Sequence, residues 1–124
     1  MLMHLYASVA SFSNGKAEQY DWSNLCSMVN HGTEIDALCY QGSYASTFSE
    51  ATQALKTCGQ RSIRVGKFGF TGPEMAMVKE ALDLHEQQLQ QVSRNQFNQA
   101  VDIVTNKFRK GDFETVIGKL HAVL

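Results

Sequence analysis

The sequence predicts an α+β fold, and two observations carry the prediction. Apolar and polar residues alternate through the first ten positions, which is typical of a strand. Further along, apolar residues recur at helical spacing from Met75 to Val92 and again from Phe97 to Phe108. We therefore expect an N-terminal β-hairpin or small antiparallel sheet packed on helices, and a C-terminal helical hairpin followed by a short terminal helix.

Composition and charge narrow the class of protein. The chain has 124 residues, so we expect a single domain over 1–124, with a mixed β/α part over 1–70 and a helical part over 71–124. A content of 44% hydrophobic residues argues against disorder, and a net charge of −1 argues against a strongly basic binder of nucleic acid. No run approaches the roughly 20 apolar residues of a membrane span. The N-terminus lacks the basic region of a signal peptide, and the three cysteines form no CxxC motif, so we expect a cytoplasmic protein.

The N-terminal third is where we expect strands. Asn14-Gly15 is a strong two-residue hairpin signal, which predicts a β-hairpin over about 2–20. Asp21 can cap a short helix that ends at Gly32. The pattern over 33–46 leaves helix and loop open.

The middle of the chain is expected to hold one helix and one short strand. Thr47-x-x-Glu50 has the form of a capping box, and Gly59 suits the end of a helix that runs to about Cys58. Residues 61–65 then alternate like a strand.

Two capping boxes define the C-terminal helices. Thr71-x-x-Glu74, with Pro73 in the first turn, begins a helix over about 73–92. Ser93-x-x-Gln96 begins the next helix almost without a loop, so the two must form a helical hairpin or continue with a sharp bend. Gly111 ends the second helix, and an amphipathic helix over 113–124 is expected after it.

The glycine-rich loop after residue 65 is the first candidate site. A glycine loop that leads into a helix N-terminus can present backbone N–H groups to an anion, although this loop lacks the spacing of a P-loop or a dinucleotide-binding motif. Basic and aromatic residues alternate around it and predict an anion, nucleic-acid or partner contact; they are Arg61, Arg64, Lys67, Phe68 and Phe70. A plain structural connector is the alternative.

Catalytic and metal sites find little support in the sequence. His85 is the one polar residue in the apolar stripe of helix 73–92, where it reads as a core or interface histidine, or as a pH-sensitive group. The spacing of Cys26, His31, Cys39 and Cys58 matches no standard metal finger. We therefore expect no enzyme activity, no metal and no cofactor.

The aromatic residues of the first seventy positions exceed what one small core should need. Tyr and Trp are favoured anchors at protein interfaces. With His85, the candidate interface residues are Trp22, Tyr40 and Tyr44.

The segment from Gly66 to Leu89 resembles a family of short, uncharacterised proteins carried on proteobacterial phages, plasmids and integrated elements. The shared pattern is a Gly-x-Phe-Gly-x-Thr-Gly-Pro-Glu entry followed by a helix that contains Ala-Leu-Asp-Leu-His-x-x-Gln-Leu. The resemblance implies a setting without a known activity. Proteins of this setting often block a host component such as restriction, CRISPR or signalling machinery.

These features together predict a non-enzymatic, protein-binding accessory protein of a mobile genetic element. Its expected partner is a host protein or ribonucleoprotein complex, which makes an anti-CRISPR or other inhibitor of host defence one form of the prediction. The regular helix stripe also suits a homodimer. The alternative is a small nucleic-acid-binding accessory or regulatory protein.

Overall fold

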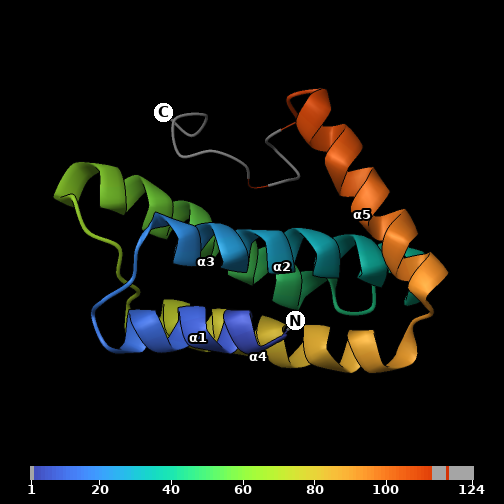
Figure 1. Cartoon of the computed structure of the whole chain (residues 1–124), viewed down its shortest axis with the longest axis horizontal. Coiled ribbons are helices and arrows are strands. Elements are labelled where there is room, and N and C mark those ends of the chain that lie inside the picture. Colours follow the sequence, from blue (N-terminus) through green and yellow to red (C-terminus); the bar gives the residue numbers. More distant parts are fainter. Residues whose placement is uncertain (1, 113–116, 118–124) are drawn as a thin grey trace.

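The computed structural model describes residues 2–112 and 117. Its elements are α1 (Leu2–Ser13), α2 (Gln19–Cys39), α3 (Ala45–Val65), α4 (Gly72–Gln91) and α5 (Arg94–Arg109) (Figure 1). Over this part of the chain every element is a helix, so the predicted α+β fold is wrong. None of the described helices is long and apolar enough to cross a membrane.

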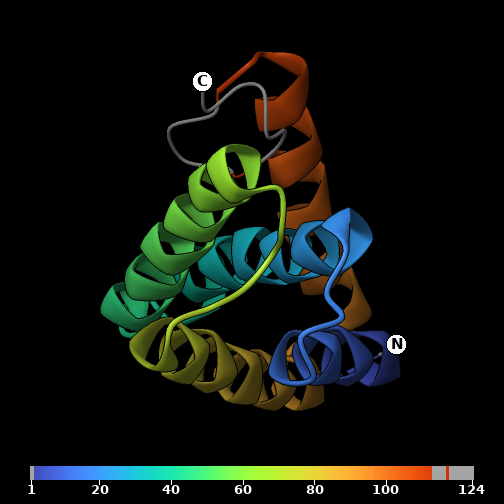
Figure 2. The same ribbon diagram turned by 90° about the vertical axis from the view of Figure 1, so that its left-hand side faces the viewer.

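Helix α2 is the centre of the molecule and packs against each of the other four helices. Figures 1 and 2 show α1 and α4 side by side along one face of α2, with α3 on another. Helix α5 packs on α2 and points away from α4 (Figure 1).

The first predicted hairpin strand is helix α1. Leu5, Val9 and Phe12 are buried at helical spacing. A strand would place Met3 on the same face as Leu5 and Val9, yet Met3 is 83% exposed. Gly15 has a φ of +69° and follows the end of the helix. Because a left-handed residue serves a helix end as well as a hairpin, the Asn-Gly signal predicted the wrong one of these two structures.

Helix α2 is longer than predicted at both ends. Glu18 is the N-cap, and the carboxylate of Asp21 accepts a hydrogen bond from its backbone N–H at 2.9 Å. Gly32 lies inside the helix rather than after it. The open segment 33–46 divides into the last turns of α2, a turn with positive φ at positions 41 and 42, and the start of α3.

The predicted strand over 61–65 is also helical. Helix α3 begins at Ala45, so the predicted capping box at Thr47 is wrong, and it continues through the buried Gly59. It ends at Gly66, whose φ of +78° is a left-handed cap. Residues 61–65 are therefore its last turns.

The two C-terminal capping boxes are confirmed, whereas the hairpin is wrong. Thr71 and Ser93 both cap their helices as predicted, with Glu74 and Gln96 as the reciprocal partners. However, α5 packs against α2 and not back along α4. Of the predicted terminal helix over 113–124, only Ile117 lies among the described residues.

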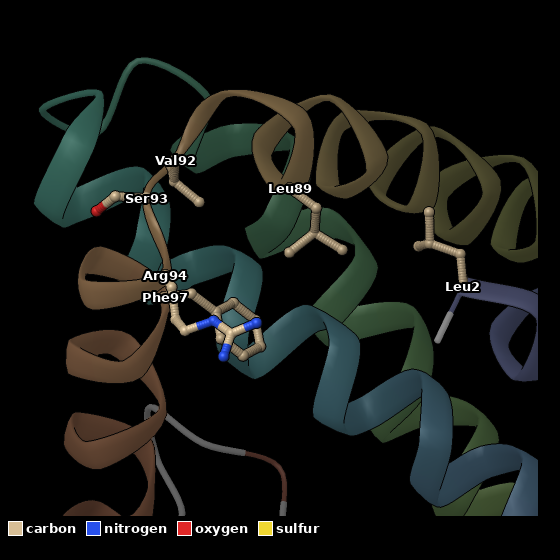
Figure 3. A pocket seen from close by; sticks show the side chains of 6 residues that line it. All are labelled: Leu2, Leu89, Val92, Ser93, Arg94 and Phe97. Atoms are coloured by element: carbon tan, nitrogen blue, oxygen red, sulfur yellow. The ribbon is translucent and has the colours of Figure 1, made fainter.

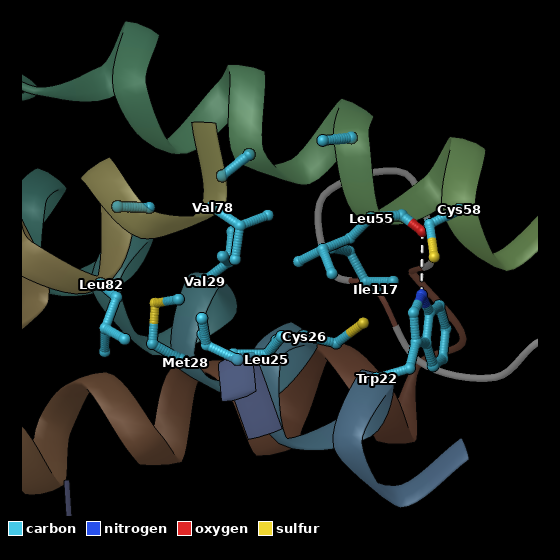
Figure 4. Close-up of a cluster of buried hydrophobic side chains, with 14 of the residues drawn as sticks. Trp22, Leu25, Cys26, Met28, Val29, Leu55, Cys58, Val78, Leu82 and Ile117 are labelled. Atoms are coloured by element: carbon cyan, nitrogen blue, oxygen red, sulfur yellow. Dashed lines mark hydrogen bonds between the residues drawn. The ribbon is translucent and has the colours of Figure 1, made fainter. Parts of the chain in front are cut away.

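The core lies where α1, α3 and α4 meet α2. Figure 4 shows side chains of α2, α3 and α4 in one buried cluster, and at one end of it the indole Nε1 of Trp22 donates a hydrogen bond to the Leu55 carbonyl oxygen at 2.9 Å. The largest fully buried side chains are Trp22, Phe48, Leu25, Ile35, Leu55, Leu82, Val29, Val78, Asp21, Asp36 and Cys58.

Candidate functional site

An open apolar groove lies at the corner between α4 and α5. We call it the α4–α5 groove; it is lined by Leu2, Leu89, Val92, Ser93, Arg94 and Phe97. Its volume is about 420 Å³, which is within the range of about 300–1,000 Å³ seen for small binding sites. Figure 3 shows Leu2 reaching it from α1 and the other five residues from the end of α4 and the start of α5.

The corner itself makes the groove. Val92 and Ser93 have extended backbone, with ψ of 150° and 161°, so α5 leaves in a new direction. The apolar stripe of α4 runs up to this corner at Leu89 and Val92, and α5 continues it with Phe97. The change of direction leaves the end of the stripe half-exposed, because α5 does not lie back over it.

The polar side of the groove is positively charged. The Ser93 hydroxyl accepts a hydrogen bond from the Gln96 N–H at 3.1 Å, which fixes the N-terminus of α5. Arg94 follows in the first turn, is exposed, and forms no ion pair or hydrogen bond with any residue that the structure describes. The first turn of α5 also contains no acidic residue, so the positive end of its dipole is uncompensated there.

The polar side chains behind the groove are the half-buried His31 of α2 and the buried His85 and Gln88 of α4. The Phe97 ring lies against His31 of α2, with ring centroids 6.2 Å apart. Next to it, Nδ1 of His85 is 3.0 Å from Oε1 of Gln88, and Nε2 of Gln88 donates to the Gly32 carbonyl oxygen at 3.1 Å. Burial lowers the pKa of His85, although the Gln88 contact opposes the shift. These contacts tie the second half of α4 to α2 and so hold one wall of the groove in place.

The predicted anion or nucleic-acid residues lie together at the end of α3 and in the loop that follows. Arg61 donates to both carboxylate oxygens of Glu74 and to the Gly69 carbonyl oxygen. Its charge is therefore already paired inside the protein. Arg64 and Lys67 are exposed.

The two aromatic residues of that loop face the protein interior. Phe70 stacks on Phe12 with ring centroids 4.1 Å apart, and Phe68 lies against Trp22 at 6.4 Å. Both are half-buried and pack against the core, so they are not free platforms for bases.

The predicted interface residues divide into two pairs. Trp22 and His85 are buried, with exposed fractions of 0% and 4%. Tyr40 and Tyr44 meet edge to face at the α2–α3 turn, with ring centroids 5.9 Å apart, and the Tyr40 hydroxyl donates to Oε1 of Gln91 at 2.8 Å. Only this second pair faces solvent, and it does not line the α4–α5 groove.

The histidines and cysteines do not form a metal centre over the described residues, where no group of three or more His, Cys, Asp or Glu side chains could hold an ion. Cys26 and Cys58 are buried, and burial raises the pKa of both thiols, that of Cys58 to about 11. These two thiols are thus poor nucleophiles.

The sequence predicts the helices that carry the groove residues, but it does not predict that these residues come together in a groove. Leu89, Val92 and Phe97 belong to the predicted apolar stripes and Ser93 to a predicted cap, whereas Arg94 groups by charge with Lys107, Arg109 and Lys110 and was not expected beside this apolar surface. The available signal was the apolar stripe of helix 73–92, which continues after His85 through Leu89 and Val92 to the Ser93 cap of the next helix.

The geometry defines an all-helical protein, over its described residues, with an open apolar groove that has one unpaired arginine. A comparison with models of protein families, with curated proteins and with solved structures found no match in any of the three. The groove must therefore be interpreted from its own residues.

Proposed function

We propose that this chain is a protein-binding module that acts without catalysis, and that its docking surface is the α4–α5 groove. The partner presents an apolar segment with an acidic side chain. The observation that carries this proposal is the combination of an apolar floor with the unpaired Arg94.

Charge complementarity selects this partner. A carboxylate that reaches the groove can form paired hydrogen bonds with the guanidinium of Arg94, and the N-terminus of α5 favours the same charge. Leu89, Val92 and Phe97 supply the apolar area that such a segment would cover. Arginine and aromatic residues are enriched among the residues that dominate binding energy at interfaces.

The biological setting of the proposal comes from the resemblance to proteins of mobile elements. We place the partner among host proteins or ribonucleoprotein complexes, with defence machinery of the restriction or CRISPR type as the first group to examine. A protein that blocks such a complex needs a docking surface and no active site of its own.

Affinity capture with matched variants tests the proposal. The tagged full-length chain, Leu89→Asp, Arg94→Glu and Arg109→Glu are each used to capture proteins from lysate of the cells that carry the gene. Arg109→Glu is the control, since it makes the same charge change on the same helix outside the groove. Arg94→Glu places an acid at a helix N-terminus, where it stabilises, so loss of binding would not reflect unfolding.

The expected result is a partner that wild type and Arg109→Glu capture and the two groove variants lose. A reversed charge on the partner's acidic residue should then restore binding to Arg94→Glu. A partner captured equally by all four proteins, or none beyond a tag-only control, contradicts the proposal.

No observation of the structure favours the nucleic-acid alternative, which stays a prediction. Its test is a gel shift at low and physiological salt with Arg64→Ala/Lys67→Ala, since binding through several phosphates weakens steeply as salt rises. A salt-dependent shift that this double variant abolishes would favour it over the proposal.

A further inference from the structure

Asn30 binds the main chain of Ile117 at two points. Its side-chain Nδ2 donates to the Ile117 carbonyl oxygen at 2.9 Å, and its Oδ1 accepts from the Ile117 N–H at 3.0 Å. Asn30 is only 2% exposed and lies in the interior of α2. We call these contacts and the surrounding apolar pocket the Asn30 site.

The two bonds follow the pattern of a β-sheet pair. Because the N–H and the C=O of Ile117 both bond to one side-chain amide, they face the same side, as they do in extended backbone. In an antiparallel hydrogen-bonded pair, one residue likewise exchanges both groups with the residue opposite. The amide of Asn30 thus supplies from a helix what a neighbouring strand would supply from its backbone.

The side chain of Ile117 fills a pocket in the core. It is 3% exposed and belongs to the same buried cluster as Trp22, Leu25 and Leu55. Figure 4 shows it among side chains of α2 and α3. Main-chain bonds that any residue can make, combined with a pocket for one side chain, are the two elements of strand-like peptide recognition.

We propose that the Asn30 site is a peptide-binding site for an extended aliphatic segment, filled in the single chain by its own Ile117 and able to accept Ile117 of a second copy. A second copy of the chain can fill the site because it carries the same Ile117 segment. Every contact of the site is reproduced whichever copy provides Ile117.

The end of α5 suits such an exchange. Gly111, six positions before Ile117, has a φ of +73° and closes the helix with its N–H bonded to the Phe108 carbonyl oxygen at 3.0 Å. A rotation about this glycine redirects the chain without strain on a side chain. Exchange of an identical element between copies is a low-cost route to a dimer because the contacts themselves are kept.

A labelled peptide with the sequence of residues 112–124 tests the site. Its binding to the full-length chain is followed by fluorescence anisotropy, with Ile117→Asp as the main receptor because its own segment no longer fits the pocket. We expect Ile117→Asp to bind the peptide at least tenfold more tightly than wild type, in which the chain's own segment competes. A peptide with aspartate at the Ile117 position is the ligand control, and the double variant Asn30→Leu/Ile117→Asp is the receptor control; neither should bind.

The helical signal in circular dichroism separates a negative result from a misfolded variant. If Ile117→Asp is folded and does not bind, or binds the control peptide equally, the proposal is overturned. If it is unfolded alone, recovery of the helical signal on addition of the peptide supports the proposal, and no recovery overturns it.

The role of the second copy has its own measurement. Tagged and untagged wild-type chains are incubated together at high concentration and separated by mass, with Asn30→Leu as the control. Mixed dimers formed by wild type and lost in Asn30→Leu are expected. Monomers alone would overturn the exchange between copies.

Discussion

A Cβ atom added to Gly32 would lie 2.4 Å from Cε1 of Phe48, because the Phe48 ring of α3 lies against the α2 backbone at this glycine. Phe48 is fully buried, so its ring has little room to move. The close packing of α2 on α3 thus depends on the absence of a side chain at Gly32.

Gly32→Ala should destabilise the protein by about 1–3 kcal/mol, the usual cost of overpacking a core. The substitution also improves helix propensity by about 1 kcal/mol, so the clash must outweigh that gain. Urea denaturation of wild type, Gly32→Ala, Phe48→Leu and the double variant measures the cost of Gly32→Ala with and without the Phe48 ring. The cost of Gly32→Ala should shrink or reverse in the Phe48→Leu background; an equal cost in both backgrounds would show that the ring is not responsible.

Glu74→Gln should lower the free energy of unfolding by about 1–2 kcal/mol, since it weakens both the capping box of α4 and the pair with Arg61. Glu80→Gln, on the exposed side of α4, is the matched control and should have little effect. If thermal or urea denaturation gives the two variants the same stability, the Arg61–Glu74 pair contributes nothing.

The effect of Glu74 should also depend on pH. Partial burial alone would raise its pKa, but the hydrogen bonds from Arg61 and from the Thr71 N–H outweigh burial and lower the pKa below its ordinary value of 4.5. The unfolded chain therefore binds this proton more readily, and the stabilisation by Glu74 is present above about pH 4.5 and lost as pH falls through the folded pKa. The difference between wild type and Glu74→Gln should accordingly shrink in acid.

Stability should decrease on mild acidification because of the buried His85 and the half-buried His31. Burial lowers the pKa of His85, and burial followed by the nearby His85 lowers that of His31. The unfolded chain then binds more protons than the folded chain just below the ordinary pKa of 6.5, so the free energy of unfolding falls as pH drops through that value. Urea midpoints at about pH 7.5 and about pH 5.5 should differ less for His85→Gln than for wild type. Equal differences for the two proteins would show that His85 does not carry the effect.

Cys39 should be the thiol that reacts first in the folded protein. It is partly exposed, whereas Cys26 and Cys58 are buried and have raised pKa values. A coloured disulfide reagent at neutral pH should label one thiol per chain quickly and the other two only after unfolding. Cys39→Ser should remove the fast phase; a fast phase that persists would mean that α2 and α3 open readily around the buried pair.

The C-terminal helices could be predicted because their signals are local. Thr71 with Glu74, and Ser93 with Gln96, satisfy backbone groups within one turn, so three or four residues define each start. The N-terminal third gave ambiguous signals. Asn14-Gly15 suits a helix end as well as a hairpin, and Leu5 and Val9, four positions apart, fall on one face of either a strand or a helix.

Interior glycines are misleading signals for a tertiary reason. Gly32 and Gly59 look like helix ends, yet both are buried inside helices, and at Gly32 the neighbouring helix explains why. The direction of α5 is equally non-local, since it follows from packing on α2. The α4–α5 groove depends on that direction, so its lining residues could be predicted as helix residues but not as a site.

Photo-crosslinking in living cells tests the docking surface most directly. A photoreactive phenylalanine analogue is placed at Val92 in the α4–α5 groove or, as the control, at Gln60 on the exposed side of α3. The proposed function predicts a discrete adduct of higher mass from position 92, absent from position 60 and lost when Arg94→Glu is added. No adduct at position 92, or the same adducts at both positions, would contradict it.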